Sequence, residues 1–366
     1  MVLTVALTVI TAGYAFEVRD GAYHAFPSDD LQRVLDAAAT NPVVKTIRVH
    51  EGTYIPSSHR QALIYLNRAH SGIQLEGVGR PVLSAANPNI ADRSSPSYPA
   101  VVNHVIYLGD GLSTNTRIAH FRLTGANHFV TNSHQEAMEP DRSVRKGRFY
   151  YGDGGAVKIY HRSYPVLQDL EIVDNYASPC AGGISIQQEG ATHQSVLIQD
   201  CVFRINRAEV TGAALDLLWG SRARVVNCLF VGNISNTGPG EGENPFSNNG
   251  VVTVFPRSRL EMDRCTLTGN RNGVDELGGL SEFTNCILTG NILAGGAPTL
   301  PRFELDLQKG ARVTGCVIRG PILDPQHAIT GANNTVDPIG LELDSAFVPL
   351  NGTFPGAGYR PPSGAP

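Results

Sequence analysis

The stretch LIQDCVFRIN (residues 197–206) returns as RVVNCLFVGN at residues 224–233, and this ten-residue frame decides the fold. Two further copies, at 261–270 and 282–291, again place cysteine at the fifth position and asparagine at the tenth. Counting a shortened copy that opens at Cys316, successive cysteines are 27, 37, 21 and 30 residues apart. A fixed frame with connections of unequal length predicts a solenoid in which equivalent residues stack on successive coils.

Each copy of the frame opens with the pattern of a β-strand. The residue three positions before the frame cysteine is always apolar, and the residue four positions before it is mostly polar. The apolar set is Leu167, Ile198, Val225, Met262, Phe283 and Val313; Leu167 belongs to an earlier copy, in which Leu170 replaces cysteine and Asn175 is the asparagine. This period of two predicts strands with one face on a core and the other towards solvent.

A glycine-led apolar run follows the asparagine and supplies a further strand to each coil. These runs begin at Gly154, Gly182, Gly212 and Gly250. Three short strands in a coil of about 20 to 30 residues are typical of a parallel β-helix. The fold class that we predict is all-β, a right-handed parallel β-helix with an N-terminal capping helix.

The stacking makes two predictions about side chains. The frame cysteines are expected to form a buried, reduced column in the core, because none of them has the close spacing of a metal-binding pair. The asparagines are expected to be structural, adopting the left-handed backbone conformation at a bend and bonding the next coil. Cys180 lies outside the frame, in a predicted loop, and its role stays open.

The domain organisation follows from the pattern at each end. Residues 16–43 are predicted to be an N-terminal cap, with a helix at 29–39 that begins after Ser28. The apolar stripe of this helix consists of Leu31, Val34, Leu35 and Ala38. Residues 44–340 are predicted to form the β-helix, and the Pro- and Gly-rich tail 341–366 to cover the far end or run along the side.

Residues 1–15 fit either an export signal or a first strand, because an apolar run is followed by small residues without a preceding basic residue. With an export signal, the expected location is secreted, periplasmic or cell-surface. The apolar run is too short to span a bilayer, and no other segment is a membrane span. A formal charge of -4 without a long basic tract argues against a nucleic-acid partner.

The chain resembles the right-handed parallel β-helix, pectate-lyase-like superfamily. The resemblance is carried by the predicted helix followed by TIRVHEGTY (46–54), by GIQLEG (72–77), by the repeated frames, and by Asn334 with Asp337 near the end. It covers nearly the whole chain and implies the fold. The superfamily includes polysaccharide lyases, glycoside hydrolases, epimerases, phage tailspikes and adhesins, so the resemblance implies several activities.

Coil length predicts where a site lies. Long excursions at about 128–153 and 234–249 leave from the asparagine corner, while the coils that end at Asn175 and Asn206 keep short connections. With rungs about 4.8 Å apart, the two excursions would form walls roughly 14 Å apart around a trough. Such a trough suits a short run of sugar rings.

The candidate site residues are the polar and aromatic side chains of this trough. The catalytic candidates are Arg207, Glu209, Asp174, Lys158, Tyr176 and Asp216. The substrate-binding candidates are Arg204, Arg145, Arg148, Tyr150, Tyr151 and Glu243. Charged groups beside aromatic rings are typical of a carbohydrate site, because rings stack on sugars and charges fix their orientation.

Two reactions fit these residues. A lyase must neutralise a uronate carboxylate and remove the neighbouring proton, with arginine or Lys158 as the cation or base and Tyr176 as the proton donor. Calcium held by Asp174, Glu209 and Asp216 is the alternative means of neutralisation. A hydrolase needs two opposed carboxyl groups, for which Asp174 with Glu209, or Asp216 with Glu209, are the candidate pairs.

The function that we expect is therefore a polysaccharide-active enzyme, preferably a lyase on an acidic glycan. The alternatives are a glycoside hydrolase and a non-catalytic glycan-binding or surface protein. One outward stripe suits a homo-oligomer contact or a position beneath a loop. It consists of Glu171, Val202, Leu229, Thr266 and Ile287.

Overall fold

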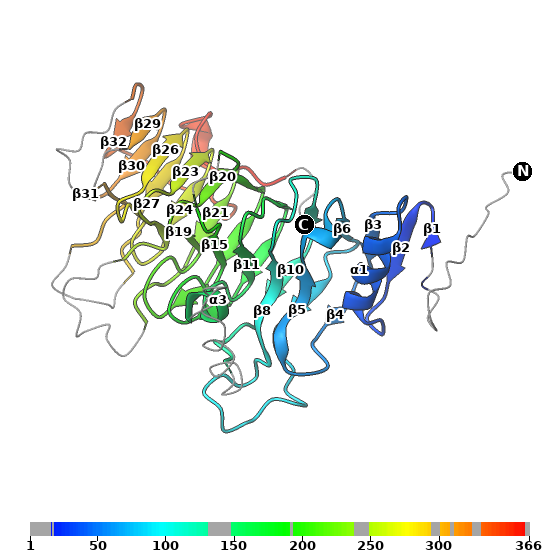
Figure 1. Cartoon of the computed structure of the whole chain (residues 1–366). Coiled ribbons are helices and arrows are strands. Elements are labelled where there is room, and N and C mark those ends of the chain that lie inside the picture. The colour runs from blue at the N-terminus through cyan, green and yellow to red at the C-terminus, as the bar shows by residue number, and fades with distance from the viewer. Residues whose placement is uncertain are drawn as a thin grey trace, which may run out of the picture.

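The computed structural model describes residues 16, 18–130, 148–190, 193–237, 249–293, 301–307, 311–323 and 331–362. The described chain is all-β, and its strands stack into long parallel sheets, as expected for a parallel β-helix. Figure 1 shows the strands side by side along one axis, with early coils at one end and late coils at the other. Residues 1–15, the predicted signal or first strand, lie outside the described residues.

Three large sheets run along this axis, and each coil contributes one strand to each of them in turn. Sheet 1 has eleven strands: β1 (Val18–Arg19), β2 (Ala22–Ala25), β3 (Thr46–Val49), β6 (Gln74–Gly77), β9 (Arg117–Ala119), β12 (Val166–Gln168), β16 (Val196–Gln199), β20 (Arg222–Val226), β23 (Arg259–Asp263), β26 (Leu280–Thr284) and β29 (Arg312–Thr314). Its pairings are parallel except for β1 with β2.

Sheet 2 contains the strands that follow the frame cysteines. Its ten strands are β4 (Thr53–Tyr54), β7 (Val82–Ser84), β10 (Arg122–Thr124), β13 (Glu171–Val173), β17 (Val202–Arg204), β21 (Leu229–Val231), β24 (Thr266–Thr268), β27 (Ile287–Thr289), β30 (Val317–Arg319) and β32 (Thr335–Val336).

Sheet 3 contains the strands that follow the glycines. Its nine strands are β5 (Arg60–Leu66), β8 (Val102–Leu108), β11 (Val157–Tyr160), β15 (Ile184–Gln187), β19 (Leu215–Leu218), β22 (Val252–Val254), β25 (Val274–Asp275), β28 (Leu305–Asp306) and β31 (Ile322–Leu323). A short fourth sheet pairs β14 (Tyr176–Ala177) with β18 (Arg207–Ala208) at the asparagine corner. The helical elements are α1 (Leu31–Thr40), η1 (Arg68–His70), α3 (Arg148–Gly152) and η3 (Leu350–Gly352).

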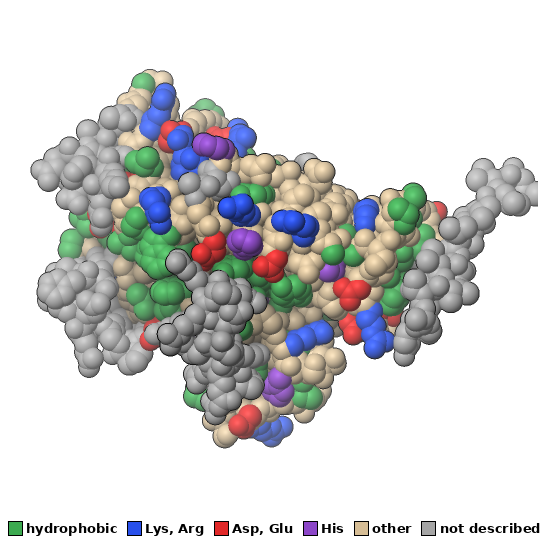
Figure 2. Space-filling view, viewed as in Figure 1, with side chains coloured by type: hydrophobic (Ala, Val, Ile, Leu, Met, Phe, Trp, Pro, Cys, Tyr) green, Lys and Arg blue, Asp and Glu red, His purple; other side chains and the backbone are tan. Residues whose placement is uncertain are grey.

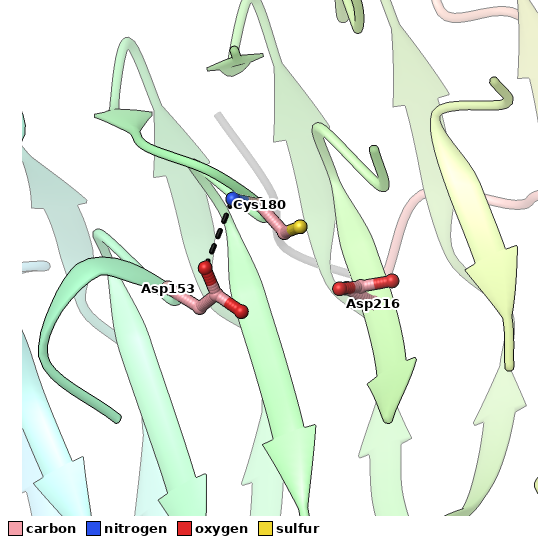
Figure 3. A group of neighbouring side chains, drawn as sticks. All are labelled: Asp153, Cys180 and Asp216. Carbon is pink, nitrogen blue, oxygen red and sulfur yellow. Dashed lines mark hydrogen bonds between the residues drawn. The ribbon is translucent and has the colours of Figure 1, made fainter. Parts of the chain in front are cut away.

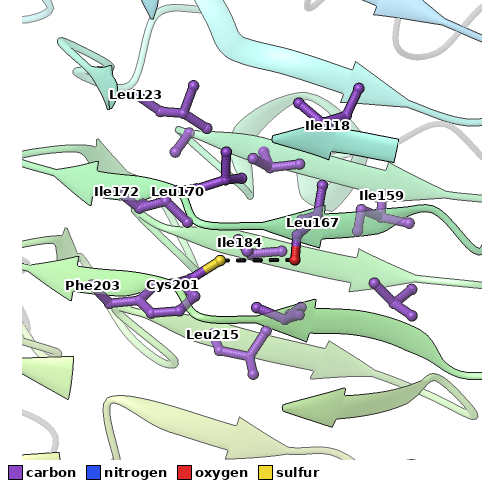
Figure 4. Packing of buried hydrophobic residues seen from close by; sticks show 14 of the residues in the cluster. Ile118, Leu123, Ile159, Leu167, Leu170, Ile172, Ile184, Cys201, Phe203 and Leu215 are labelled. Carbon is purple, nitrogen blue, oxygen red and sulfur yellow. Dashed lines mark hydrogen bonds between the residues drawn. The ribbon is translucent and has the colours of Figure 1, made fainter. Parts of the chain in front are cut away.

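The predicted cysteine column is confirmed. The strands that follow the frame cysteines pair in the predicted register, for example Val202 with Leu229, and all the frame cysteines are free and fully buried. The amide of Cys201 donates to Cys228 Sγ at 3.4 Å, so neighbouring coils place these residues in direct contact. In Figure 4, Cys201 packs among apolar side chains of the same core. The Phe203 and Phe230 rings stack with their centres 4.5 Å apart.

The asparagines form a buried ladder, but they do not adopt the left-handed conformation as predicted. That conformation belongs to the residue before each asparagine, for example Asp174 (φ 52°), Ile205 (φ 50°) and Gly232 (φ 67°). The asparagine side chain instead bridges coils: Asn206 Nδ2 donates to Asn233 Oδ1 at 3.0 Å. At each bend, the residue before the asparagine adopts the left-handed backbone conformation, and the asparagine side chain makes the hydrogen bond to the next coil.

Helix α1 is shorter at its start than predicted. Asp30 is the N-cap, because its carboxylate accepts the Gln32 amide hydrogen at 3.0 Å, and Ser28 is not. The predicted apolar stripe is confirmed, with Leu31, Val34, Leu35 and Ala38 buried in the core. Strands β1 and β2 precede the helix, and β2 pairs with β3, so a coil strand already lies within the segment predicted to be the cap.

The described tail runs back along sheet 2. Tyr359 donates its amide to Thr266 Oγ1 at 2.9 Å, and Ala357 packs with Ile287 in one apolar cluster. Leu229, Thr266 and Ile287 are therefore buried instead of facing solvent. Of the two interpretations of the stripe, its position beneath another part of the chain is the one seen for these three residues, while Glu171 and Val202 stay partly exposed. A homo-oligomer contact stays a prediction.

Candidate functional site

The short sheet at the asparagine corner holds the exposed part of the candidate site. Tyr176 begins β14 and pairs with Arg207, which begins β18 on the next coil. Asn127 forms a parallel bridge with Tyr176 on the other side. The buried asparagines Asn175 and Asn206 immediately precede these residues and fix the register of the corner. The side chains of Tyr176 and Arg207 are thereby brought together on adjacent rungs.

The geometry at this corner is that of a cation beside an aromatic ring. The Arg207 guanidinium carbon lies 5.7 Å from the centre of the Tyr176 ring. Arg207 Nη2 lies 3.7 Å from Asp174 Oδ1, and these two side chains are 50% and 60% exposed. The His128 ring meets Tyr176 edge-on at 6.4 Å. We call His128, Asp174, Tyr176 and Arg207 the corner row.

Glu209 belongs to the same stretch but serves a local role. It follows β18, and its carboxylate accepts a hydrogen bond from the hydroxyl of Ser178 on the neighbouring coil. Its amide donates to Ala177 O at 3.1 Å, which continues the pairing of the two connections. The structure thus brings Glu209 next to the corner row, while tying its carboxylate to Ser178.

Lys158 and Asp216 lie on the outer side of sheet 3, in register through Ser185. All three are fully buried, whereas the predicted trough would leave Lys158 and Asp216 exposed. The covering material is α3 and the neighbouring connections: Lys158 Nζ donates to Phe149 O at 2.7 Å and to Ser185 Oγ at 3.1 Å. A polymer has no access to these groups, so neither is in place to act on one.

Burial also determines the electrostatics of this region. Loss of solvation lowers the pKa of Lys158 to about 8, although Asp153 and Asp216 act in the opposite direction. Burial, reinforced by Asp153, raises the pKa of Asp216 well above its usual value. Burial likewise raises the pKa of the Cys180 thiol, so Cys180 is a buried group and not a reactive surface thiol.

The other predicted substrate-binding residues separate from the corner row. Tyr150 and Tyr151 are buried, because α3 packs them against Tyr107 and Tyr160 on the outer side of sheet 3. Arg204 ends β17 in sheet 2, where its guanidinium lies 5.7 Å from the Phe347 ring of the tail. These side chains therefore pack against other parts of the fold.

The walls of the predicted trough fall largely outside the described residues. Arg145 and Glu243 lie there entirely, and for Arg148 only the backbone, at the start of α3, is described. Their proposed contacts with a substrate remain predictions.

The predicted calcium ligands do not converge. Among the described residues, the group of three potential ligands whose atoms lie within 4.8 Å of one another is Asp153, Cys180 and Asp216. Asp174 is instead paired with Arg207, and Glu209 with Ser178. Asp216 is fully buried, so the predicted pair of Asp216 with Glu209 is not open to a polymer, while the pair of Asp174 with Glu209 stays a prediction.

Two hollows in the described surface lie away from the corner row. One, of about 230 Å³, is lined by the start of α1 and by β4, including Asp30 and Tyr54. The other, of about 460 Å³, lies between the tail and sheet 2, including Arg319 and Phe347. The second hollow also has an aromatic ring and an arginine, but the Arg319 guanidinium already donates to Thr289 Oγ1 and to Leu341 O. We therefore base the candidate site on the chemistry of the corner row instead of concavity.

Two side chains of this region lie outside the predicted site residues. Asp153 meets Asp216 and Cys180 in space. Trp219 is 45% exposed and packs edge-on against Phe149 and Phe255. The sequence carries one signal for the burial of Asp216. The strand Leu215–Leu218 is apolar on both faces except for Asp216, which is typical of a strand covered on both sides.

No family model, no curated protein and no solved structure matches this chain. Within the described residues, no helix has the length and apolar character needed to cross a membrane.

Proposed function

We propose that this chain binds an acidic, uronate-containing polysaccharide along the corner row of a pectate-lyase-like, right-handed β-helix. The observation that carries the proposal is the exposed Arg207 guanidinium, positioned beside the Tyr176 ring on the adjacent rung. A planar guanidinium matches a carboxylate, and an aromatic face matches the apolar face of a sugar ring. Asp174 is the present ionic partner of Arg207 at the surface. A uronate carboxylate would take the place of the Asp174 carboxylate beside the guanidinium.

The charge distribution on one face of the molecule fits recognition by individual side chains. Cationic and anionic side chains are interspersed on the face shown in Figure 2, without a large field of one sign. A polyanion would therefore be held at particular arginines instead of by general attraction. A secreted or cell-surface location accompanies this proposal, because such polymers are extracellular.

β-Elimination is the second candidate function, and it is favoured by the Tyr176 side chain beside Arg207. Arg207 would neutralise the uronate carboxylate, which makes the proton on the adjacent ring carbon more acidic. That proton would pass to a base as the bond to the leaving glycosidic oxygen breaks, and Tyr176 would supply a proton to this oxygen. The scheme uses neither the buried Lys158 nor a carboxylate pair.

The binding proposal is tested with a matched pair of polymers, a polyuronate and the same polymer after reduction of its carboxyl groups. We expect the chain to bind the polyuronate and to lose about tenfold in affinity with Arg207→Gln, because one charge-assisted contact disappears. Arg312→Gln is the control, since Arg312 is exposed on sheet 1. Equal binding of the two polymers, or equal losses in the two variants, would rule out the proposal.

Tyr176→Phe separates binding from catalysis, because it keeps the ring and removes the hydroxyl. Unsaturated product formed from the polyuronate is followed by its ultraviolet absorbance. For a lyase, the variant should bind normally and form no product. If the wild-type chain binds without forming product, the elimination step is excluded and the binding function stands.

A further inference from the structure

Three acidic or thiol side chains from successive coils meet beneath the outer surface of sheet 3. Asp153 follows α3, Cys180 lies in the connection after β14, and Asp216 lies in β19. Figure 3 shows the three side chains directed towards a common space. Their potential ligand atoms all lie within 4.8 Å of one another, and all three residues are buried.

The backbone holds this group in place. The Cys180 amide donates to Asp153 Oδ1 at 2.9 Å, and Cys180 forms a parallel bridge with Thr211 on the next coil. Gly212, at φ +59°, leaves the space next to Asp216 open: a Cβ atom there would lie 2.9 Å from Asp216 Oδ1. The chain therefore keeps room around the carboxylate instead of filling it with a side chain.

Asp216 provides an independent indication of a ligand. Its side chain is fully buried, and neither carboxylate oxygen receives a hydrogen bond from a nitrogen or oxygen donor. Its neighbours in the same register differ: Ser185 Oγ accepts from Lys158 Nζ at 3.1 Å, and Thr253 Oγ1 donates to Gly250 O at 3.3 Å. An unsatisfied buried carboxyl group is costly, so a ligand beside Asp216 would offset this cost.

Lys158 is not that partner, because its ammonium group is already committed. Its three donors are taken up by Phe149 O at 2.7 Å, Ser185 Oγ at 3.1 Å and Gln187 Oε1 at 3.0 Å. It nevertheless contributes a positive charge close to the group. With both carboxylates and the thiolate ionised, the group carries three negative charges, and the Lys158 ammonium carries one positive charge. A divalent cation brings the total to zero, so a divalent ion is the species that completes the site.

We propose that Asp153, Cys180 and Asp216 form a structural binding site for a divalent transition-metal ion, with Zn²⁺ as the best-suited ion. A thiolate with two carboxylates is a donor set for Zn²⁺, whereas Ca²⁺ and Mg²⁺ require oxygen ligands. Metal–ligand bonds are about 2.0 to 2.3 Å long, so two ligand atoms of one ion lie at most about 4.6 Å apart. The three ligand atoms here lie within 4.8 Å of one another, so small movements of the side chains would bring all of them to one ion. The ion would link three successive coils. This site does not depend on the glycan-binding proposal.

The site is tested on the full chain, unfolded in chelator and refolded with or without one equivalent of metal, because the group is buried. Zn²⁺ is expected to raise the melting temperature by several degrees at one ion per chain, and Ca²⁺ to leave it unchanged. Co²⁺ is expected to give a thiolate-to-metal absorption band. Failure of the wild-type chain to bind Zn²⁺ or to give this band overturns the proposal without any variant.

Variants locate the ion. Asp216→Asn should abolish the Zn²⁺-dependent shift, and Cys180→Ser should abolish the Co²⁺ band. Asp275→Asn is the matched control, because Asp275 is another buried acid of sheet 3 two strands away and should leave both signals intact. A shift and band that persist in Asp216→Asn and Cys180→Ser would place the ion elsewhere and contradict the assignment.

Discussion

The side-chain amide of Asn291 donates to the carboxylate of Glu304, so the ladder of buried asparagines ends on a titratable group. The backbone amide of Asn291 also donates to Glu304 Oε1, at 3.1 Å. Burial raises the pKa of Glu304 to about 7, and the hydrogen bonds from Asn291 only partly oppose this effect. The last rung of the ladder therefore senses pH in the neutral range.

This relationship predicts a stability that depends on pH. Because the folded pKa lies above the unfolded value of 4.5, Glu304 contributes stability below pH 4.5 that is lost as pH rises through about 7. Relative to Glu304→Gln, the wild-type free energy of unfolding should fall by about 3 kcal/mol over this range. This change is measured as the difference between the free energies of unfolding in urea at about pH 4.5 and at about pH 7. Glu342→Gln, at an exposed site, should follow the wild type; an identical pH profile for Glu304→Gln would contradict the account.

The middle of the ladder should be sensitive to truncation. Asn233 Oδ1 accepts from the amide and side chain of Asn206, and Asn233 Nδ2 donates to Phe203 O and to Asn270 Oδ1, each at 3.0 Å. Asn233→Ala leaves these buried groups without partners and should lower the free energy of unfolding by about 3 kcal/mol or more. The exposed Asn89→Ala is the comparison and should change it by less than about 0.5 kcal/mol. Similar small losses in the two variants would show that the ladder does not stabilise the fold.

Ile205 offers a stabilising substitution. It has φ 50° in the position that glycine occupies at residues 232, 269 and 290 of later coils, and it is 46% exposed. A β-branched residue is strained in this conformation, whereas asparagine tolerates it. Ile205→Asn should raise the free energy of unfolding by about 1 kcal/mol, measured by urea denaturation. The reverse change, Gly232→Ile, should lower it, and a loss in both variants would argue against strain at Ile205.

The contact of the tail with sheet 2 depends on Gly358. A Cβ atom on Gly358, which has φ +78°, would lie 2.6 Å from Ile287 Cδ1. Gly358→Ala should therefore loosen the tail and speed its removal by a protease severalfold. Gly356→Ala is the control, because a Cβ there meets nothing within 4 Å. Equal rates of cleavage in the two variants would mean that the tail does not depend on this close approach.

The stacking could be predicted from sequence because it rests on a local repeat. The spacing from cysteine to asparagine is constant, so aligning the frames aligned the strands: Arg224 pairs with Glu261, and Glu282 with Arg312, as the frames predict. The alternation also identified the core residues. What the frames did not encode is which residue at the corner adopts the left-handed conformation, because both residues there suit a bend.

The burial of Lys158 and Asp216 could not be predicted in the same way. Alternation shows which side chains leave the core of the coil, but it does not show what folds over them afterwards. Here α3 and the connections around Cys180 cover the outer side of sheet 3, and their path depends on contacts far apart in sequence. The burial of Ile287 could not be predicted either, because it depends on the tail that packs over sheet 2.

The most direct test of glycan recognition is a double-mutant cycle between Arg207 and the uronate carboxylate. Calorimetry gives the affinity of wild-type and Arg207→Gln chains for an oligouronate and for its carboxyl-reduced counterpart. If the guanidinium binds the carboxylate, the two changes should be strongly non-additive, with a coupling of about 1 to 3 kcal/mol. Additive losses, with a coupling near zero, would contradict the proposed contact.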